Sequence, residues 1–452
     1  MSSPANEGLM EKIVALCKRR GFVYPSAEIY GGLAGFFDYG PLGLALKNNI
    51  KNLWWKQFVS NRDDMFGVDA ALITKKEVLE ASGHVGGFSD PMVVCSKCKH
   101  RFRADQITRS DLGDGKKVGP FCPDCGGALG DLSQFNMMFQ THVGAVQEEN
   151  SVAYLRPETA QGIFTNFKNV VDSFHPRLPF GIGQIGKAFR NEIAPRDFLF
   201  RLRELEQMEV EYFVKPKEWE GVFEMWRTEM LRFLESIGID RTKTHELEVS
   251  EGDRAHYSKR TFDFDFDFPF GRKELYGLAY RTDFDLRNHQ TMSGAKLEFV
   301  DEETNESFIP HVVEPSLGVE RSVLAVLLSA YTEDEMNGEV RSFLKLKPAV
   351  APIKAAVFPL LKNKPELVAK AREVYQLLKK DPAFGGAVMF DDNGNIGKRY
   401  RRQDEIGTPF CITVDFDSLE KGDVTVRARD TGKQDRMAIQ ELTIFLRNQP
   451  AS

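Results

Sequence analysis

The chain has 452 residues, which is enough for two or three domains with a core each. Hydrophobic residues make up 42% of the sequence and charged residues 28%, and the formal net charge of −6 excludes a protein that coats nucleic acid through bulk positive charge, although local basic patches can still bind it. No stretch approaches the roughly 18 apolar residues of a membrane helix, and the acidic start lacks the pattern of a secretory signal or a transit peptide, so we expect a cytoplasmic protein with no membrane partner.

The N-terminal part is predicted to be helical. A short helix over 7–20 leads to a turn rich in glycine and aromatic residues. A longer helix follows, with Leu46, Ile50, Trp54 and Phe58 near helical spacing. A stripe of this kind packs against a core or against a partner helix.

Four of the six cysteines form two C-x-x-C pairs, Cys95 with Cys98 and Cys122 with Cys125. Two such pairs with a polar insert between them have the spacing of a four-thiolate zinc ribbon. Four sulfur ligands leave no open position on the metal, so we predict a structural Zn²⁺. The alternative is four buried or incidental thiols.

Two strands joined by a loop are predicted where the sequence reads GQIGKAFRNEI and, after the loop, LEQMEVEYF. Alternation along the first strand puts Arg190 and Glu192 on one face, and alternation along the second puts Gln207, Glu209 and Glu211 on one face. The pattern raises the question of which ligand needs arginines on one arm of a hairpin and carboxylates on the other.

A strict alternation, FDFDFDFPF, occupies 262–270. Its phenylalanines share one face of a strand and its aspartates share the other. A row of carboxylates can bind metal, but we favour a half-buried edge strand with a solvated face.

The character of the sequence changes at a proline-bearing linker near 345–352. Beyond it, strand and helix patterns alternate, which predicts a small α/β domain with a mostly parallel core sheet.

Phosphate recognition is expected to depend on side chains, because the sequence has no Walker loop and no G-x-G-x-x-G between a strand and a helix. Arginine suits this task, since its planar fork stays charged and grips phosphate by two bonds. Candidates are Arg190, Arg196, Arg201, Arg203 and Arg321. For each one taken singly, a solvated or salt-bridged role is the alternative.

Several motifs now carry a resemblance to one family. FRNEI and FRLRELEQMEVEYF resemble motif 2 of class II aminoacyl-tRNA synthetases, GVERSVLAVL resembles motif 3, and the long amphipathic helix with Pro41 at its start resembles motif 1. Together with RPETAQG, EPSLGVER and GNIGKRYRRQDEIGTPF, they resemble the glycyl-tRNA synthetases of homodimeric type, from about Met10 to Leu446.

The resemblance implies an α+β fold. Residues 1–88 and 151–345 are expected to form a class II antiparallel-sheet catalytic domain, 89–150 a zinc-ribbon-like insert, and 346–452 an α/β anticodon-binding domain. It also implies a glycine–tRNA ligase that acts as a homodimer, with ATP as substrate, Mg²⁺, and glycine and tRNA(Gly) as partners. We expect no editing domain, because a pocket excludes larger amino acids by clash.

For ATP, the resemblance places Arg190 on the α-phosphate, Arg321 on the γ-phosphate or the adenine face, and Glu192 at the adenine amino group, so these three are the expected catalytic residues. Mg²⁺ is expected at Glu274. The implied ATP-binding residues are Arg190, Asn191, Glu192, Phe200, Arg201, Leu202, Arg203, Glu204, Leu205, Glu274, Leu275, Gly318, Val319, Glu320 and Arg321.

For glycine, the resemblance places Glu158, Glu209 and Glu314 around the ammonium, with Ser316 beside it and Arg103 as a further contact. The implied glycine-binding residues are Arg103, Glu158, Leu205, Glu206, Gln207, Met208, Glu209, Glu314, Pro315, Ser316, Leu317 and Gly318.

One residue departs from the family pattern: Leu205 stands where motif 2 usually has a phenylalanine that stacks on adenine. Leucine covers the ring by apolar contact but lacks the stacking contribution of about 0.5 to 1.5 kcal/mol.

In the C-terminal domain, Lys398, Arg399, Arg401 and Arg402 form a basic cluster that is a candidate contact for tRNA phosphates. The alternative is a solvated helix face.

Three other functions are weighed against this one. A catalytically inactive synthetase-like subunit conflicts with the presence of Arg190 and Arg321. A zinc-ribbon nucleic-acid-binding module conflicts with the acidic balance and with the carboxylates. A synthetase for another small amino acid conflicts with the joint occurrence of RPETAQG and EPSLG.

Overall fold

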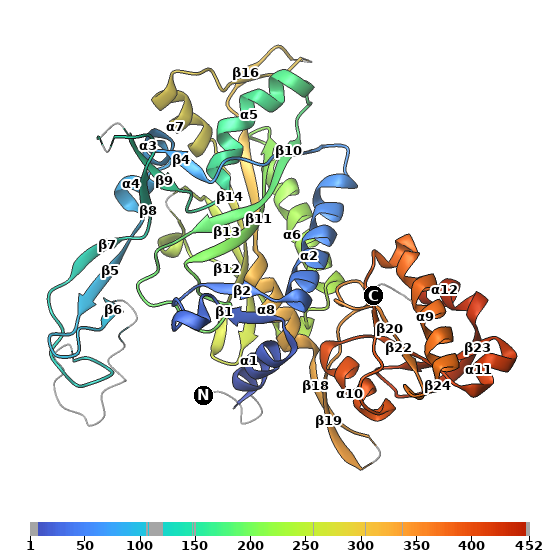
Figure 1. The fold of residues 1–452 in the computed structure, drawn as a ribbon. Coiled ribbons are helices and arrows are strands. Elements are labelled where there is room, and N and C mark those ends of the chain that lie inside the picture. Colours follow the sequence, from blue (N-terminus) through green and yellow to red (C-terminus); the bar gives the residue numbers. More distant parts are fainter. Residues whose placement is uncertain are drawn as a thin grey trace.

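The computed structural model describes residues 8–104, 107, 121–146, 148, 151–255, 257–302, 304–336 and 338–448. Its largest sheet has seven strands, and a separate five-stranded sheet forms the C-terminal part, at the lower right of Figure 1. No helix in these ranges is both long and apolar enough to cross a membrane.

The seven-stranded sheet is antiparallel except at one edge. The short strand β3 runs parallel to β10, and every other neighbouring pair is antiparallel. In spatial order its strands are β12 (Thr244–Glu248), β13 (Arg260–Phe268), β14 (Gly271–Thr282), β17 (His311–Gly318), β11 (Glu204–Val214), β10 (Phe180–Phe189) and β3 (Met65–Gly67).

Helices cover one face of this sheet with the main core of the chain. The helices are α1 (Leu9–Arg20), α2 (Pro41–Trp55), α6 (Trp219–Ser236) and α8 (Val319–Ala330). The predicted stripe on α2 is confirmed, because Leu46, Ile50 and Trp54 are fully buried, and Phe58 is buried just beyond the end of the helix. Along β11, Met208, Val210, Tyr212 and Val214 face this core.

The opposite face carries a smaller core. Helices α5 (Ala160–Phe174) and α7 (Phe284–Ser293) pack there, at the top of Figure 1, against Phe180, Phe213 and Val312. Because side chains alternate along a strand, the odd-numbered residues of β11 and the even-numbered residues of β17 lie on this face. Glu209 and Glu314 are among them.

The prediction that 262–270 forms an edge strand was wrong. β13 lies between β12 and β14, and the edge belongs to β12. The predicted division of faces is confirmed: Phe262, Phe264, Phe266 and Phe268 are buried, whereas the aspartates between them are partly exposed.

Two small three-stranded sheets lie on the left of Figure 1, the first toward the lower left and the second above it. One is made of β5 (Ser89–Val94), β6 (Arg101–Arg103) and β7 (Ser133–Asn136), and its neighbourhood carries the four paired cysteines. The other is made of β4 (Ile73–Lys75), β8 (Phe139–His142) and β9 (Val152–Leu155), next to the short helices α3 (Lys76–Ala81) and α4 (His84–Gly87).

Three two-stranded ribbons complete the N-terminal three quarters of the chain. They are β1 (Val23–Pro25) with β2 (Phe37–Tyr39), β15 (Phe299–Val300) with β16 (Ser307–Phe308), and β18 (Tyr331–Met336) with β19 (Glu339–Leu344). The last of these leads into the C-terminal domain (Figure 1).

The C-terminal sheet is mixed. Its strands are, in spatial order, β21 (Val388–Phe390), β20 (Ala355–Pro359), β22 (Phe410–Val414), β23 (Asp423–Ala428) and β24 (Gln434–Ala438). Both pairings of β20 are parallel and both pairings of β23 are antiparallel, so the prediction of a mostly parallel sheet holds for one half only. Its helices are α9 (Pro365–Lys380), α10 (Ile396–Ile406), α11 (Phe416–Lys421) and α12 (Ile439–Arg447).

The basic cluster on α10 needs a correction. Arg399 is 1% exposed and donates to the carbonyl oxygens of Asp392 and Gly394, at 3.0 and 2.7 Å. It holds the loop that precedes α10 and is not presented to a ligand. Lys398 is exposed, and Arg401 and Arg402 are partly exposed.

Candidate active site

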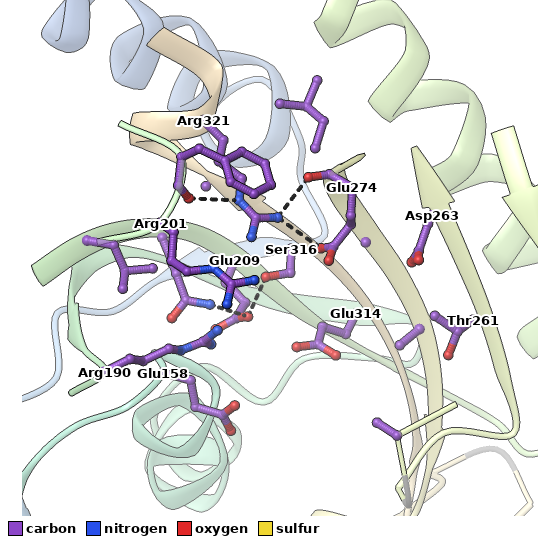
Figure 2. A pocket seen from close by; sticks show the side chains of 18 of the residues that line it. Glu158, Arg190, Arg201, Glu209, Thr261, Asp263, Glu274, Glu314, Ser316 and Arg321 are labelled. Carbon is purple, nitrogen blue, oxygen red and sulfur yellow. Dashed lines mark hydrogen bonds and ion pairs between the residues drawn. The ribbon is translucent and has the colours of Figure 1, made fainter. Parts of the chain in front are cut away.

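A cavity of about 460 Å³ lies on the face of the seven-stranded sheet that α5 covers, and Figure 2 shows it from close by. Its lining comes from β11, β13, β14 and β17, from the loop between β10 and β11, and from the start of α8. Arg321 and Arg201 lie toward one end of it and Glu158 and Glu314 toward the other, with Arg190 and Glu209 between them (Figure 2).

Arg190 and Glu192 do not stand on a strand as predicted. β10 ends at Phe189, and the chain leaves the sheet there as a loop that returns at Glu204. The loop is tied at its base, because the backbone N–H of Arg190 donates to the carbonyl oxygen of Arg203 at 2.9 Å. The side chain of Arg190 is fixed separately, by a 3.0 Å bond from its Nε to the carbonyl oxygen of Pro157.

The arginine side of the cavity has atoms that are ready for an anion. Arg201 Nη1 and Glu192 Oε2 are buried, 3.8 Å apart, and neither has a hydrogen-bond partner among the described residues. Burial lowers the pKa of Arg201, and the positive charges of Arg103, Arg196 and Arg321 lower it further. The carboxylate of Glu192 partly offsets this effect on Arg201. Several arginines that converge on one side of a cavity favour a bound anion.

Arg321 is held over an aromatic ring. Its guanidinium lies 4.4 Å from the ring centre of Phe200, and its Nη1 donates to the carbonyl oxygen of Glu274 at 2.8 Å. With both contacts in place, the end of the guanidinium still points into the cavity (Figure 2). Since Leu205 also lines the cavity, apolar and cationic surfaces meet at this end.

The carboxylate side is buried and hydrogen-bonded. Glu209 accepts from the hydroxyls of Ser316, at 2.7 Å, and Thr159. Glu158 is 9% exposed; burial opposes its ionisation, but His84, Arg281 and Gln161 outweigh this effect and hold the pKa of its carboxyl below its usual value.

Glu314, the third carboxylate, is paired with a buried arginine. It accepts from Arg281 Nη1 at 3.0 Å, yet burial and the neighbouring Glu209 and Glu158 raise the pKa of its carboxyl. Arg281 is itself 1% exposed and is gripped at two oxygens by Asp285, both bonds being 2.8 Å long. Among the described residues, the carboxylates of this recess therefore outnumber the cations that pair with them.

Two family models match the chain. The model described as tRNA synthetase class II core domain (G, H, P, S and T) matches residues 139–331, and the model described as anticodon binding domain matches 354–449. A glycine–tRNA ligase of Clostridium kluyveri is 48% identical, with 98% of each chain covered, and one of Bacillus cereus is 49% identical, with 97% of this chain and 98% of the relative covered. The chain belongs to the glycine–tRNA ligase family. It is a class II aminoacyl-tRNA synthetase and an ATP-dependent ligase.

Further relatives agree with this membership. A glycine–tRNA ligase of Caldanaerobacter subterraneus is 47% identical, with 97% of each chain covered. Among solved structures, the prolyl-tRNA synthetase of Giardia lamblia in complex with prolyl-adenylate superposes with a TM-score of 0.69 at 18% identity, covering 97% of this chain and 76% of that chain. This second likeness shows the fold alone.

The alternation of strands decides which residues of the family motifs reach the cavity. On β11 and β17, Leu205, Gln207, Glu209, Glu314 and Ser316 line it, whereas the residues between them point into the α2 core or away. The predicted contacts that the described lining leaves out are Asn191, Arg203, Glu204, Glu206, Met208, Pro315, Leu317 and Val319.

Two of these residues have other partners. Arg203 donates to the carbonyl oxygens of Ala34 and Glu192, at 2.9 and 3.0 Å, so it braces the loop. Glu206 lies on the α2 side of the sheet and pairs with Lys47 at 2.6 Å. The prediction that the side chain of Glu206 lies in the glycine pocket was therefore wrong.

Several lining residues were not predicted from the sequence. Tyr257 lies 3.8 Å from the guanidinium of Arg281, measured to the ring centre, and covers it on the cavity side. Asp263 belongs to the aspartate face of β13, and burial together with Glu274 and Asp265 raises the pKa of its carboxyl to about 7. The alternation of phenylalanine and aspartate predicted the aspartate face, but it did not predict that this face lies at the cavity.

The two cysteine pairs of this family member come together. The sulfurs of Cys95, Cys98, Cys122 and Cys125 all lie within 4.8 Å of one another. The backbone N–H of Cys98 faces the sulfur of Cys95 at 3.4 Å and lowers the pKa of that thiol to about 6. Four converging thiols, one of them favoured as thiolate, fit a tetrahedral Zn²⁺.

Proposed function

We propose that the cavity binds glycine at its carboxylate end and ATP at its arginine end, and that the enzyme joins them as glycyl-adenylate before transferring glycine to tRNA. The observation that carries this proposal is that the carboxylate end and the arginine end of the cavity adjoin each other. Glu209 and Ser316 lie beside the side chains of Arg190 and Arg201 (Figure 2). A carboxylate of glycine and the α-phosphorus of ATP are thereby brought within one site.

For glycine, Glu158 and Glu209 supply the negative charge that an ammonium needs, Glu314 lies beside them as a hydrogen-bond acceptor, and the hydroxyl of Ser316 fixes Glu209. Arg103, which also pairs with Asp90 at 2.7 Å, is the proposed contact for the carboxylate side. Glycine has no side chain to recognise, so charge selects an amino acid and lack of room rejects larger ones.

For ATP, Arg190 and Arg201 are the proposed phosphate ligands, because a guanidinium donates two parallel bonds to phosphate oxygens. Phe200, Leu205 and Arg321 are proposed to enclose the base, and Glu192 to accept from its amino group. Leu205 supplies apolar cover here without aromatic stacking.

Mg²⁺ fits the carboxylates beside Arg321. Glu274 pairs across the strands with Asp265, and Asp263 lies on the same face. The repulsion that raises the pKa of Asp263 is the kind that a divalent cation relieves. When bound, the ion would neutralise phosphate charge; Glu274 with these two aspartates is the proposed donor set.

The reaction needs no enzyme nucleophile. A carboxylate oxygen of glycine attacks the α-phosphorus, the bond to the bridging oxygen breaks, and pyrophosphate leaves. A hydroxyl of the terminal adenosine of tRNA then attacks the adenylate carbonyl and AMP leaves. In this proposal Arg190 and Arg201 lie where negative charge grows on the phosphorus, so they stabilise the transition state without rearrangement.

Zn²⁺ is proposed for the four cysteines, in a structural role, because four sulfur ligands leave no position for substrate. For tRNA(Gly), the C-terminal domain is the proposed anticodon-binding unit, with Lys398, Arg401 and Arg402 as basic contacts on α10. A cytoplasmic location is proposed from the paired cysteines, which suit a reducing compartment.

A homodimer is proposed from the resemblance of α2 to motif 1 and from exposed apolar side chains in the segment that precedes it. Ile29 and Tyr30, in the turn between β1 and β2, are 89% and 87% exposed, and Leu33 of the same turn and Leu44 of α2 are at least half exposed. Exposed apolar side chains of this size favour a protein interface.

The test of the function is exchange of labelled pyrophosphate into ATP with glycine, alanine or serine as the amino acid. We expect exchange with glycine and at most traces with the other two. Exchange that is equal for glycine and alanine would reject the pocket, and its absence with all three would reject the activation step.

A further inference from the structure

A lysine is buried behind the cavity, between two carboxylates. Lys47 of α2 is 6% exposed, and its Nζ lies 2.6 Å from Glu206 Oε2 and 3.1 Å from Glu320 Oε1. The ring of Tyr39 closes the space, with its centre 4.5 Å from Nζ. Burial opposes the charge of Lys47, but the two carboxylates outweigh it and raise the pKa of the amine.

Both carboxylates belong to segments that line the cavity. Glu206 stands between Leu205 and Gln207, which point to the cavity while Glu206 points to α2. Glu320 directly precedes Arg321 at the start of α8. A cation that binds both side chains therefore fixes two walls of the cavity from behind.

The two segments also bond to each other. The ladder between β11 and β17 ends at Gln207 opposite Gly318. Beyond that pair, the backbone N–H of Glu206 donates to Glu320 Oε2 at 2.7 Å. Lys47 binds the other oxygen of the Glu320 carboxylate. It therefore orients the carboxylate that accepts the hydrogen bond from the backbone of Glu206.

We infer that Lys47 is a positioning residue for ATP: through Glu206 and Glu320 it sets the spacing between Leu205 and Arg321, the two sides of the proposed adenosine pocket. The inference rests on the proposed assignment of ATP to the Arg321 end. It makes α2, which lies on the far face of the sheet from the cavity, a determinant of nucleotide affinity. Small displacements of positioned groups lower affinity and rate because the pocket is preorganised.

The first test compares two lysines that share Glu206. Lys51 pairs with Glu206 from the more exposed side, with 25% of its side chain accessible, and has no bond to Glu320 in the described structure. Lys47→Met should raise the KM for ATP in pyrophosphate exchange about tenfold or more and leave the KM for glycine within about twofold. Lys51→Met should leave both within about twofold. An unchanged KM for ATP in Lys47→Met, or an equal rise in both variants, would overturn the inference.

A second variant separates positioning from charge balance, since removing one partner of a buried pair is itself destabilising. In Lys47→Met, Glu206 keeps Lys51 as a partner, so the uncompensated charge is that of Glu320. Lys47→Met/Glu320→Gln removes this charge and keeps an acceptor for the backbone N–H of Glu206, so thermal stability should recover toward that of the parent while the KM for ATP stays raised. Recovery of both quantities would show that Lys47 only balances charge. ATP binding measured by calorimetry gives the same comparison without turnover, so a parent protein that binds ATP but fails to exchange would reject the proposed function and leave this inference testable.

Discussion

Arg190 shows how a single side chain is prepared for its role. It extends from a loop, yet its Nε is fixed to the carbonyl oxygen of Pro157 and its backbone to Arg203, so the guanidinium is held before any ligand arrives. Loss of one such preorganised group lowers the rate by roughly 10² to 10³. Arg190→Ala should therefore remain folded and lose pyrophosphate exchange by about this factor.

The matched control for that variant is Arg232→Ala. Arg232 is an exposed arginine on α6, whose side chain is 67% accessible and pairs only with the neighbouring Glu229 among the described residues. Circular dichroism of both variants should superpose on that of the parent. A rate for Arg190→Ala within a few fold of the rate for Arg232→Ala would refute the role.

Asp263 predicts a pH dependence of stability. Its pKa is raised to about 7, so between about pH 4 and 7 the folded state binds more protons at this group than the unfolded state does. The contribution of Asp263 to the free energy of unfolding therefore falls as pH rises through this window and then levels off. Asp263→Asn should be more stable than the parent at pH 8, with a smaller difference at pH 5.5. Urea unfolding at several pH values measures this, and a difference that does not change with pH would contradict it.

Elements were predictable where the pattern is local. The periods of α2, β11 and β13 gave both the element and its buried face, because alternation and helical spacing are properties of consecutive residues. The end of β10 at Phe189 was not predictable, since Arg190 continues the alternation but bonds to Pro157, 33 residues away in the chain. The interior position of β13 was missed for a similar reason, because it depends on pairing with β12, which is short and polar.

Residue types and the family resemblance predicted which residues belong to the site. They did not predict what each side chain contacts. Glu206 and Glu209 look alike in the sequence. Alternation along the strand puts them on opposite faces, but only the fold shows that one face meets Lys47 of α2 and the other the cavity. Arg399 reads as one of several basic residues, and only the fold reveals that it binds carbonyl oxygens. Burial of a charged group depends on partners that are distant in sequence.

The cysteine-bearing element should depend on metal. Its core is small, with few buried apolar residues beside the sulfurs, and structural zinc contributes folding energy directly. We expect one zinc per chain by elemental analysis, and Cys122→Ser should lose it and lower the melting temperature of the protein. Ser96→Ala, an exposed position beside Cys95, is the control and should keep the metal. A zinc-free parent with full stability would reject the site.

At the scale of the whole molecule, a buried ion cluster joins the C-terminal domain to the rest. Asp404 of α10 is 1% exposed and accepts from Arg341 of β19 at 3.1 Å and from Arg427 of β23 at 2.8 Å. A second contact links Glu405 to Arg20 of α1. Helix α10 is thus fixed between the two parts of the chain, and its outer face is held in a set orientation relative to the catalytic domain.

That outer face gives the last prediction. Lys398 is exposed, and Arg401 pairs only with Glu339 and a nearby carbonyl among the described residues, so both cations remain accessible to phosphate. Replacing both with alanine should weaken tRNA binding and reduce the slope of log K against log salt concentration by about 0.7 to 0.9 for each phosphate that the protein no longer neutralises. Pyrophosphate exchange needs no tRNA, so it should stay at the parental rate. A weaker affinity with an unchanged salt slope would indicate a change in domain position and no direct role in phosphate binding, and an unchanged affinity would make this face of α10 a solvated surface.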